Sequence, residues 1–120
     1  MIFSLMIESN PRNRSTGVKG VTFSPKNSKD NPFKAHASRT DPLLANTIFI
    51  DRSIYPWGGT NLEICLTKTR CEALLLKSAF LSDPAYYEQV WLNKPIRAKT
   101  GNRGPLTRDD FPAELLETVL

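Results

Sequence analysis

The chain has 120 residues, a net charge of +4 and 40% hydrophobic residues, which is the size and composition of one domain with a core of its own. Two cysteines and one histidine are too few for a disulfide framework or a paired-cysteine zinc site. No stretch is long and apolar enough to cross a bilayer. We therefore predict a single cytoplasmic domain over residues 1–120, without metal or cofactor.

The first half of the chain predicts short strands separated by a long loop. Residues 1–7 form an apolar run interrupted only by Ser4, which is typical of a buried strand. Residues 21–24 are a second candidate strand, between a glycine and a proline. The surrounding segment is rich in Asn, Ser and Pro, so we predict one long basic loop at about residues 9–42.

Two later segments alternate apolar and polar residues, as half-buried strands do. They cover residues 47–54 and 61–67, and the turn-forming sequence Tyr55-Pro-Trp-Gly-Gly59 connects them. Two alternating runs joined by a short Gly-Gly loop are the signature of a β-hairpin. We therefore expect these two segments to pair with each other in a mainly antiparallel sheet.

The second half of the chain predicts three helices, over residues 70–81, 84–92 and 111–119. Thr69 and Glu72 have the spacing of a capping box, in which the two residues satisfy each other's exposed main-chain amides. The first helix is apolar around nearly its whole circumference, which is typical of a central helix or one in a subunit interface. Strands followed by helices indicate an α+β fold, with the sheet packed by three C-terminal helices.

Positive charge is concentrated in two loop segments. Residues 9–40 carry seven basic side chains against one acid, and residues 93–108 carry five with no acid. Such loops suit a polyanion, most simply nucleic acid, or an acidic protein surface, although their cations could also pair with acids elsewhere in the fold. We expect a non-enzymatic binding module. Its candidate binding residues are Arg12, Arg14, Lys19, Lys26, Lys29, Lys34, Arg39, Arg97, Lys99 and Arg103.

The alternative is a protein–protein interaction module, either a homodimer or an inhibitor of another protein. It would use the apolar helix 70–81 and the Tyr55–Trp57 loop, because exposed aromatic side chains are frequent anchors of interfaces. The competing interpretation is that both features are buried in the core of the monomer.

A third hypothesis is a small hydrolase that uses His36. This histidine lies close in sequence to Arg39 and Asp41, so His36 could act as a general base while Arg39 holds a phosphate. A simple turn before Pro42 explains the same residues, and we assign no catalytic residue. The two cysteines, Cys65 and Cys71, are expected to be structural thiols.

Overall fold

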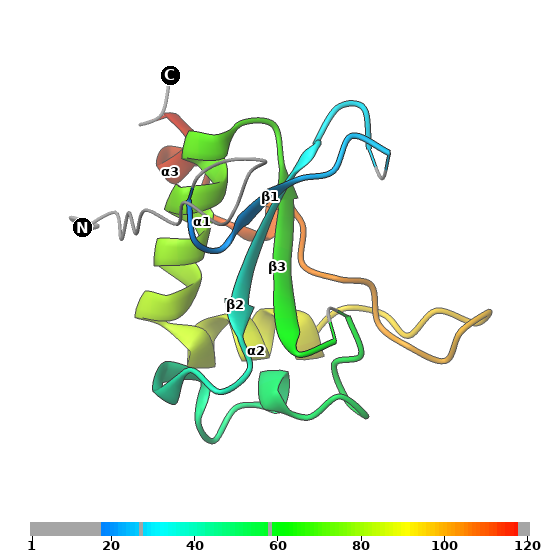
Figure 1. Ribbon diagram of the computed structural model, residues 1–120. Coiled ribbons are helices and arrows are strands. Elements are labelled where there is room, and N and C mark those ends of the chain that lie inside the picture. Colours follow the sequence, from blue (N-terminus) through cyan, green and yellow to red (C-terminus); the bar gives the residue numbers. More distant parts are fainter. Residues whose placement is uncertain (1–17, 27, 58, 118–120) are drawn as a thin grey trace.

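The computed structural model describes residues 18–26, 28–57 and 59–117, and it confirms the α+β fold. A three-stranded antiparallel sheet in the order β1-β2-β3 packs against helix α1 (Figure 1). The strands are β1 (Val21–Phe23), β2 (Phe33–Ser38) and β3 (Asn61–Thr67). The helices are α1 (Arg70–Ser82), α2 (Pro84–Leu92) and α3 (Ala113–Glu117).

Strand alternation gives the sheet one buried face and one polar face. The buried side chains, which include Val21, Ala35, Ala37, Leu62 and Ile64, lie on the face that α1 covers. The partly exposed side chains between them are Thr22, Lys34, His36 and Glu63. A register shift between Ala35 and His36 marks a β-bulge in the β2–β3 ladder. The polar face is thus built from three strands that the register holds in fixed order.

The prediction of one long loop at residues 9–42 is wrong for the described part of that segment. It contains β1, the central strand β2 and a short 3₁₀ helix at Pro42–Leu44. The candidate strand at 21–24 is confirmed as β1, whereas residues 1–7 lie outside the described residues. Strand β2 was not predicted because its only fully buried side chains, Ala35 and Ala37, are small and give little hydrophobic contrast.

The predicted strand at 47–54 is also wrong, although β3 coincides with the predicted 61–67. Ile48–Ile50 form a 3₁₀ helix, and β3 pairs with β2 rather than with this segment. Phe49 is fully buried while Ile50 is exposed, which is the reverse of the predicted alternation. The preceding turn is held by Thr47, whose hydroxyl donates to the Leu44 carbonyl at 2.6 Å.

Helices α1 and α2 occupy the predicted ranges. The Thr69 hydroxyl accepts from the Glu72 amide at 3.0 Å, and the Glu72 carboxylate accepts from the Lys68 amide at 3.1 Å. The buried stretch of α1 extends through residues 72–81, so this helix is the centre of the fold. Helix α3 begins at Ala113 instead of residue 111, since Phe111 follows a separate 3₁₀ turn and packs into the core.

Aromatic side chains fill the end of the core where the loop over residues 42–60 meets α2. Trp91 on α2 packs against Tyr55, with ring centres 5.1 Å apart, and Tyr55 packs edge-on against Phe49 at the same separation. No helix in the described part of the chain has the length and apolar character that a bilayer span requires.

Candidate functional site

The first basic loop forms a short arm between β1 and β2. We call residues 24–32 the first arm; Asn27 within it is not described. The Ser24 amide donates to the Pro32 carbonyl at 2.6 Å, and the rings of Phe23 and Phe33 pack at 5.1 Å beside this closure. Because the base of the arm is fixed, Lys26 and Lys29 extend from a defined position on the sheet.

The second basic loop is a hairpin-like arm over residues 93–104. Ile96 and Arg103 form an antiparallel bridge, and the Arg97 amide donates to the Asn102 carbonyl at 2.8 Å. Gly101 closes the turn with a φ of 70°, which glycine adopts without steric cost. The main-chain bonds therefore hold Arg97, Lys99 and Arg103 on a compact projection, which we call the second arm.

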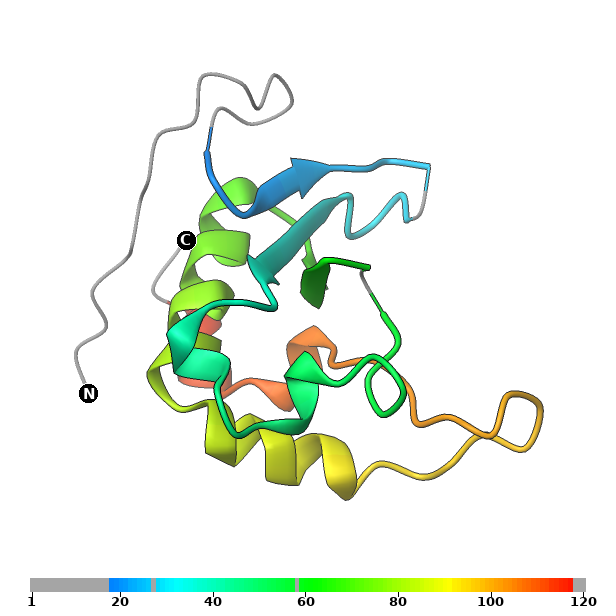
Figure 2. The same cartoon turned by 60° about the horizontal axis from the view of Figure 1, so that its bottom comes forward.

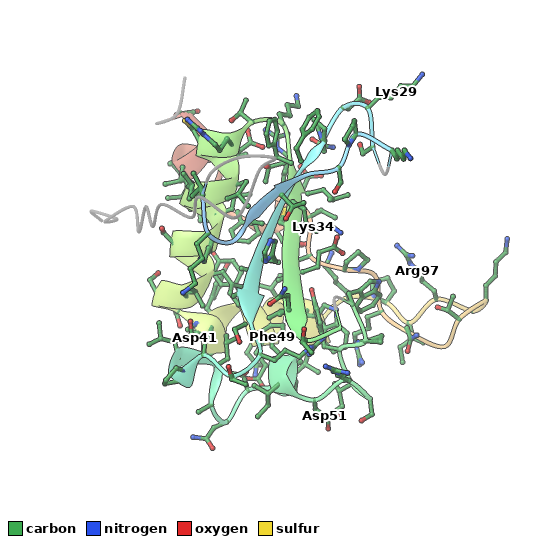
Figure 3. The ribbon with its side chains drawn as sticks, viewed as in Figure 1. Lys29, Lys34, Asp41, Phe49, Asp51 and Arg97 are labelled. Carbon is green, nitrogen blue, oxygen red and sulfur yellow. The ribbon has the colours of Figure 1, made fainter. Side chains whose placement is uncertain are left out.

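Both arms project from the same side of the molecule. The view of Figure 1 and the turned view of Figure 2 each show the β1–β2 connection and the loop after α2 extending to the right, one above the other. In Figure 3 Lys29 lies at the end of the first arm and Arg97 lies on the second arm. Lys34 lies on the sheet, below Lys29 and above Arg97 in this view. Segments about seventy residues apart in the chain thus present their cations in one direction.

Four of the cations on the arms have no carboxylate partner among the described residues. Lys26, Lys29, Arg97 and Lys99 are exposed, and none of them makes an ion pair within residues 18–117. The guanidinium of Arg103 is partly exposed and lies 5.3 Å from the centre of the Trp91 ring. Burying these charges against phosphate would therefore break none of the ion pairs in the described structure.

The other candidate cations are not part of this surface. Lys34 is paired with Glu63 at 3.4 Å across the β2–β3 ladder. Lys19 precedes β1 and so lies at the opposite end of that strand from the first arm. Arg12 and Arg14 lie outside the described residues. Lys34 remains near the arms, but its charge is already shared with a carboxylate.

Arg39 has a structural role that sequence reasoning missed. Its side chain is buried and donates to main-chain carbonyls of the loop that follows it: Nε to Gly59 at 2.7 Å, and Nη2 to Tyr55 at 2.8 Å and to Trp57 at 2.6 Å. Nη1 also donates to the Phe49 carbonyl. All three guanidinium nitrogens already donate to carbonyls of this loop, so we leave Arg39 out of the candidate binding surface.

The features behind the protein–protein alternative are in the core. Tyr55 is fully buried, and Trp57 is partly buried with its ring 6.2 Å from that of Trp91. The apolar residues of α1 are covered by the sheet and by α2 and α3. The Tyr55–Trp57 loop and α1 therefore offer no large exposed apolar face in the described structure.

The residues grouped around His36 in the sequence do not converge in the fold. Nε2 of His36 lies 2.8 Å from the Thr22 hydroxyl, whereas the Asp41 carboxylate caps the 3₁₀ helix at Pro42–Leu44 and Arg39 binds its loop. Burial lowers the pKa of His36, and the nearby charges of Lys77 and Lys34 lower it further. The three side chains therefore do not form the group that the hydrolase hypothesis requires.

The two cysteines differ in their surroundings. Cys65 is buried on β3, and burial raises the pKa of its thiol to about 12, while Cys71 is exposed near the start of α1. Among the described residues, no group of three or more His, Cys, Asp or Glu side chains could hold a metal ion.

Comparison of the chain with models of protein families, with curated proteins and with solved structures gives no match. Its function therefore has to be inferred from its own residues.

Proposed function

We propose that this protein is a small non-enzymatic binding module for a polyanion, and that the polyanion is nucleic acid. The observation that supports the proposal is the common direction of the two basic arms, whose cations Lys26, Lys29, Arg97 and Lys99 lack ion-pair partners among residues 18–117 (Figure 3). A phosphate backbone is a row of negative charges, and two projections facing one way can contact it at separate points.

The physical gain on binding would come from release of counterions. If Lys26, Lys29, Arg97, Lys99 and Arg103 each contact a phosphate, the logarithm of the binding constant should fall with the logarithm of salt at a slope of about −3.5 on a single strand. Affinity would then drop by about a hundredfold between roughly 50 and 200 mM salt. Partly exposed Phe23, at the base of the first arm, offers a ring on which a base can stack.

Binding of a fluorescein-labelled single-stranded decanucleotide, followed by anisotropy over this range of salt, tests the proposal. Three variants that each remove one positive charge should be compared: Lys29→Gln on the first arm, Arg97→Gln on the second, and Arg52→Gln as the control. Arg52 is exposed on the loop over residues 42–60, which belongs to neither arm.

We expect each arm variant to weaken binding about three- to fivefold and to reduce the salt slope by about 0.7, while Arg52→Gln changes neither. Equal losses in all three variants would mean that only net charge matters. A binding constant that hardly responds to salt would refute contact with phosphates, and absence of binding would refute the proposal as a whole.

A further inference from the structure

A hollow lies on the polar face of the sheet, at the end of β1 opposite the first arm. Its volume is about 260 Å³. The lining comes from all three strands, from the residues that precede β1 and from one side chain of α1. It shares no residue with either arm, so it is a separate part of the surface. Its polar side chains are those of Lys19, Thr22, His36, Ser38, Asn61 and Lys77.

Gly20 makes room for the ammonium group of Lys77 at this hollow. Lys77 is buried on α1, although lysine side chains usually reach solvent. A β-carbon on Gly20 would collide with the Lys77 Nζ atom and would lie 2.8 Å from the His36 carbonyl oxygen. Gly20 also has a φ of 83°, which glycine adopts without steric cost. The fold therefore brings a buried positive charge to the wall of the hollow.

The charged groups that line the hollow are cationic. Lys19 and Lys77 contribute two ammonium groups, and no Asp or Glu among the described residues lines it. Glu63 lines the adjoining hollow on the same face, but its carboxylate is paired with Lys34 at 3.4 Å. Burial lowers the pKa of His36, and the charges of Lys77 and Lys34 lower it further, as a positive potential at this face would. The hollow therefore favours an anion.

Neutral hydrogen-bond donors complete the surroundings of this anion. The side-chain amide of Asn61 is exposed and makes no hydrogen bond within the described residues. The Thr22 hydroxyl lies 2.8 Å from Nε2 of His36. When that nitrogen carries the proton and donates it to Thr22, the hydroxyl can donate its own proton to a ligand. The hollow thus combines two ammonium groups with amide and hydroxyl donors.

We infer that this hollow binds the dianionic phosphate group of a phosphate monoester. Two ammonium groups match its two negative charges, whereas a phosphodiester in a nucleic-acid backbone carries only one. One water molecule takes about 30 Å³ in the liquid, so the hollow holds a phosphate group and part of the molecule that carries it. The inference goes beyond the proposed function, because neither arm takes part in it.

Methyl phosphate and dimethyl phosphate are matched probes of the charge, since the first is a dianion at pH 7.5 and the second a monoanion. Each should be titrated into the full chain at constant ionic strength, set with sodium chloride. Proton NMR follows the imidazole signals of His36, which lines the hollow and is the one histidine in the sequence. We expect saturable shifts, with methyl phosphate bound about fivefold more tightly, the effect of one additional charge in a solvated site.

Lys19→Gln and Lys29→Gln remove one positive charge from the hollow and from the first arm, respectively. Lys19 is exposed, so its substitution spares the core, whereas substitution of buried Lys77 would threaten the fold. Lys19→Gln should weaken the binding of methyl phosphate about fivefold, because one of the two ammonium groups is lost. Lys29→Gln is the matched control and should leave this affinity unchanged.

A small phosphorylated molecule and the phosphorylated end of a nucleic-acid strand both carry a monoester. Thymidine decanucleotides with and without a terminal phosphate distinguish these sources. Tighter binding of the phosphorylated strand, by a margin that Lys19→Gln removes, assigns the hollow to the end of a strand. Equal binding of the two strands, with methyl phosphate still bound, assigns it to a small molecule.

The outcomes are independent of the proposed function. Absence of saturable shifts would overturn the inference and leave the polyanion module standing. Equal affinity for the two phosphates would also overturn it, and so would an equal loss in Lys19→Gln and Lys29→Gln, since only net charge would then matter. Conversely, methyl phosphate binding that Lys19→Gln weakens would support the hollow even if no oligonucleotide binds to the arms.

Discussion

Trp91 and Arg103 fix the second arm to helix α2. The Cζ atom of Arg103 lies 5.3 Å from the centre of the Trp91 ring, and the Nε atom of Arg103 donates to the Leu92 carbonyl at 3.2 Å. The indole Nε1 of Trp91 donates in turn to the Gly104 carbonyl at 3.0 Å. One buried aromatic residue thus holds the returning limb of the arm by a hydrogen bond and a cation–π contact.

Trp91→Phe should therefore loosen the second arm. The variant loses the bond to Gly104 and weakens the contact with Arg103, which together should lower the free energy of unfolding by about 1–2 kcal/mol. Urea denaturation measures that change. Limited trypsin digestion measures the arm itself, since cleavage after Arg97 and Lys99 should accelerate more than cleavage after Lys26 and Lys29.

Trp57→Phe is the control for this experiment, because Trp57 also packs near Trp91 but its indole nitrogen makes no hydrogen bond in the described structure. It should leave the rate of cleavage in the second arm unchanged. Equal acceleration in both variants would show that general loss of core packing, rather than the Trp91 contacts, controls the arm.

Arg39→Lys should destabilise the protein despite keeping the charge. The guanidinium reaches four carbonyls, at Phe49, Tyr55, Trp57 and Gly59, whereas a lysine ammonium concentrates its donors at one point and cannot reach all of them. We expect a loss of about 2–4 kcal/mol in urea denaturation, because carbonyls around a buried centre lose their partners. Arg52→Lys, on the exposed neighbouring turn, should change stability by less than about 0.5 kcal/mol. A similar small effect of Arg39→Lys would mean that water replaces the guanidinium.

The elements that the sequence predicted well are those with local signals. The capping box and the run of apolar residues locate α1, Asp83 and Pro84 locate the start of α2, and strict alternation locates β3. The segment at 47–54 shows the limit of that reasoning: its alternation is as regular as that of β3. It folds into a 3₁₀ turn because Phe49 enters the aromatic core, a tertiary contact that periodicity does not reveal.

The candidate site was predictable only as a distribution of charge. Clustering of cations identified both arms, but their common direction depends on the unpredicted strand β2 and on the bridge between Ile96 and Arg103. The pairing of Lys34 with Glu63 depends on strand register. Arg39 resembled any other loop cation, because the carbonyls that bind it lie 10 to 20 residues away in the sequence.

The two thiols should react very differently in the folded protein. Cys71 is exposed, whereas Cys65 is buried with a pKa raised to about 12, so it is protonated and inaccessible at neutral pH. Titration with a chromogenic disulfide reagent at pH 8 should release one equivalent of thiolate quickly from the native protein, and two after unfolding in urea. Cys71→Ser should abolish the fast equivalent. Rapid reaction of both thiols in the native state would contradict the burial of β3.

The stability of the protein should depend on pH through His36, the one histidine in the sequence. Its pKa lies below the ordinary value of 6.5 because the imidazole is buried and lies near Lys77 and Lys34. The Nε2 atom of the ring is hydrogen-bonded to the Thr22 hydroxyl. Below pH 6.5 the unfolded chain then binds a proton that the folded chain does not. The free energy of unfolding therefore falls as the pH drops from 6.5 toward the lowered pKa, and it recovers above 6.5.

Urea denaturation at pH 5.5 and 7.5 tests this dependence, with His36→Gln as the comparison. The gain in stability between the two pH values should be larger in the parent protein, because glutamine can keep a hydrogen bond to Thr22 but does not titrate. A proton NMR titration of the folded protein gives the pKa directly, and the assignment is unambiguous because the chain contains no other imidazole. A pKa above 6.5 would mean that carboxylates such as the neighbouring Glu63 outweigh burial and the two lysines, and the pH dependence would then reverse.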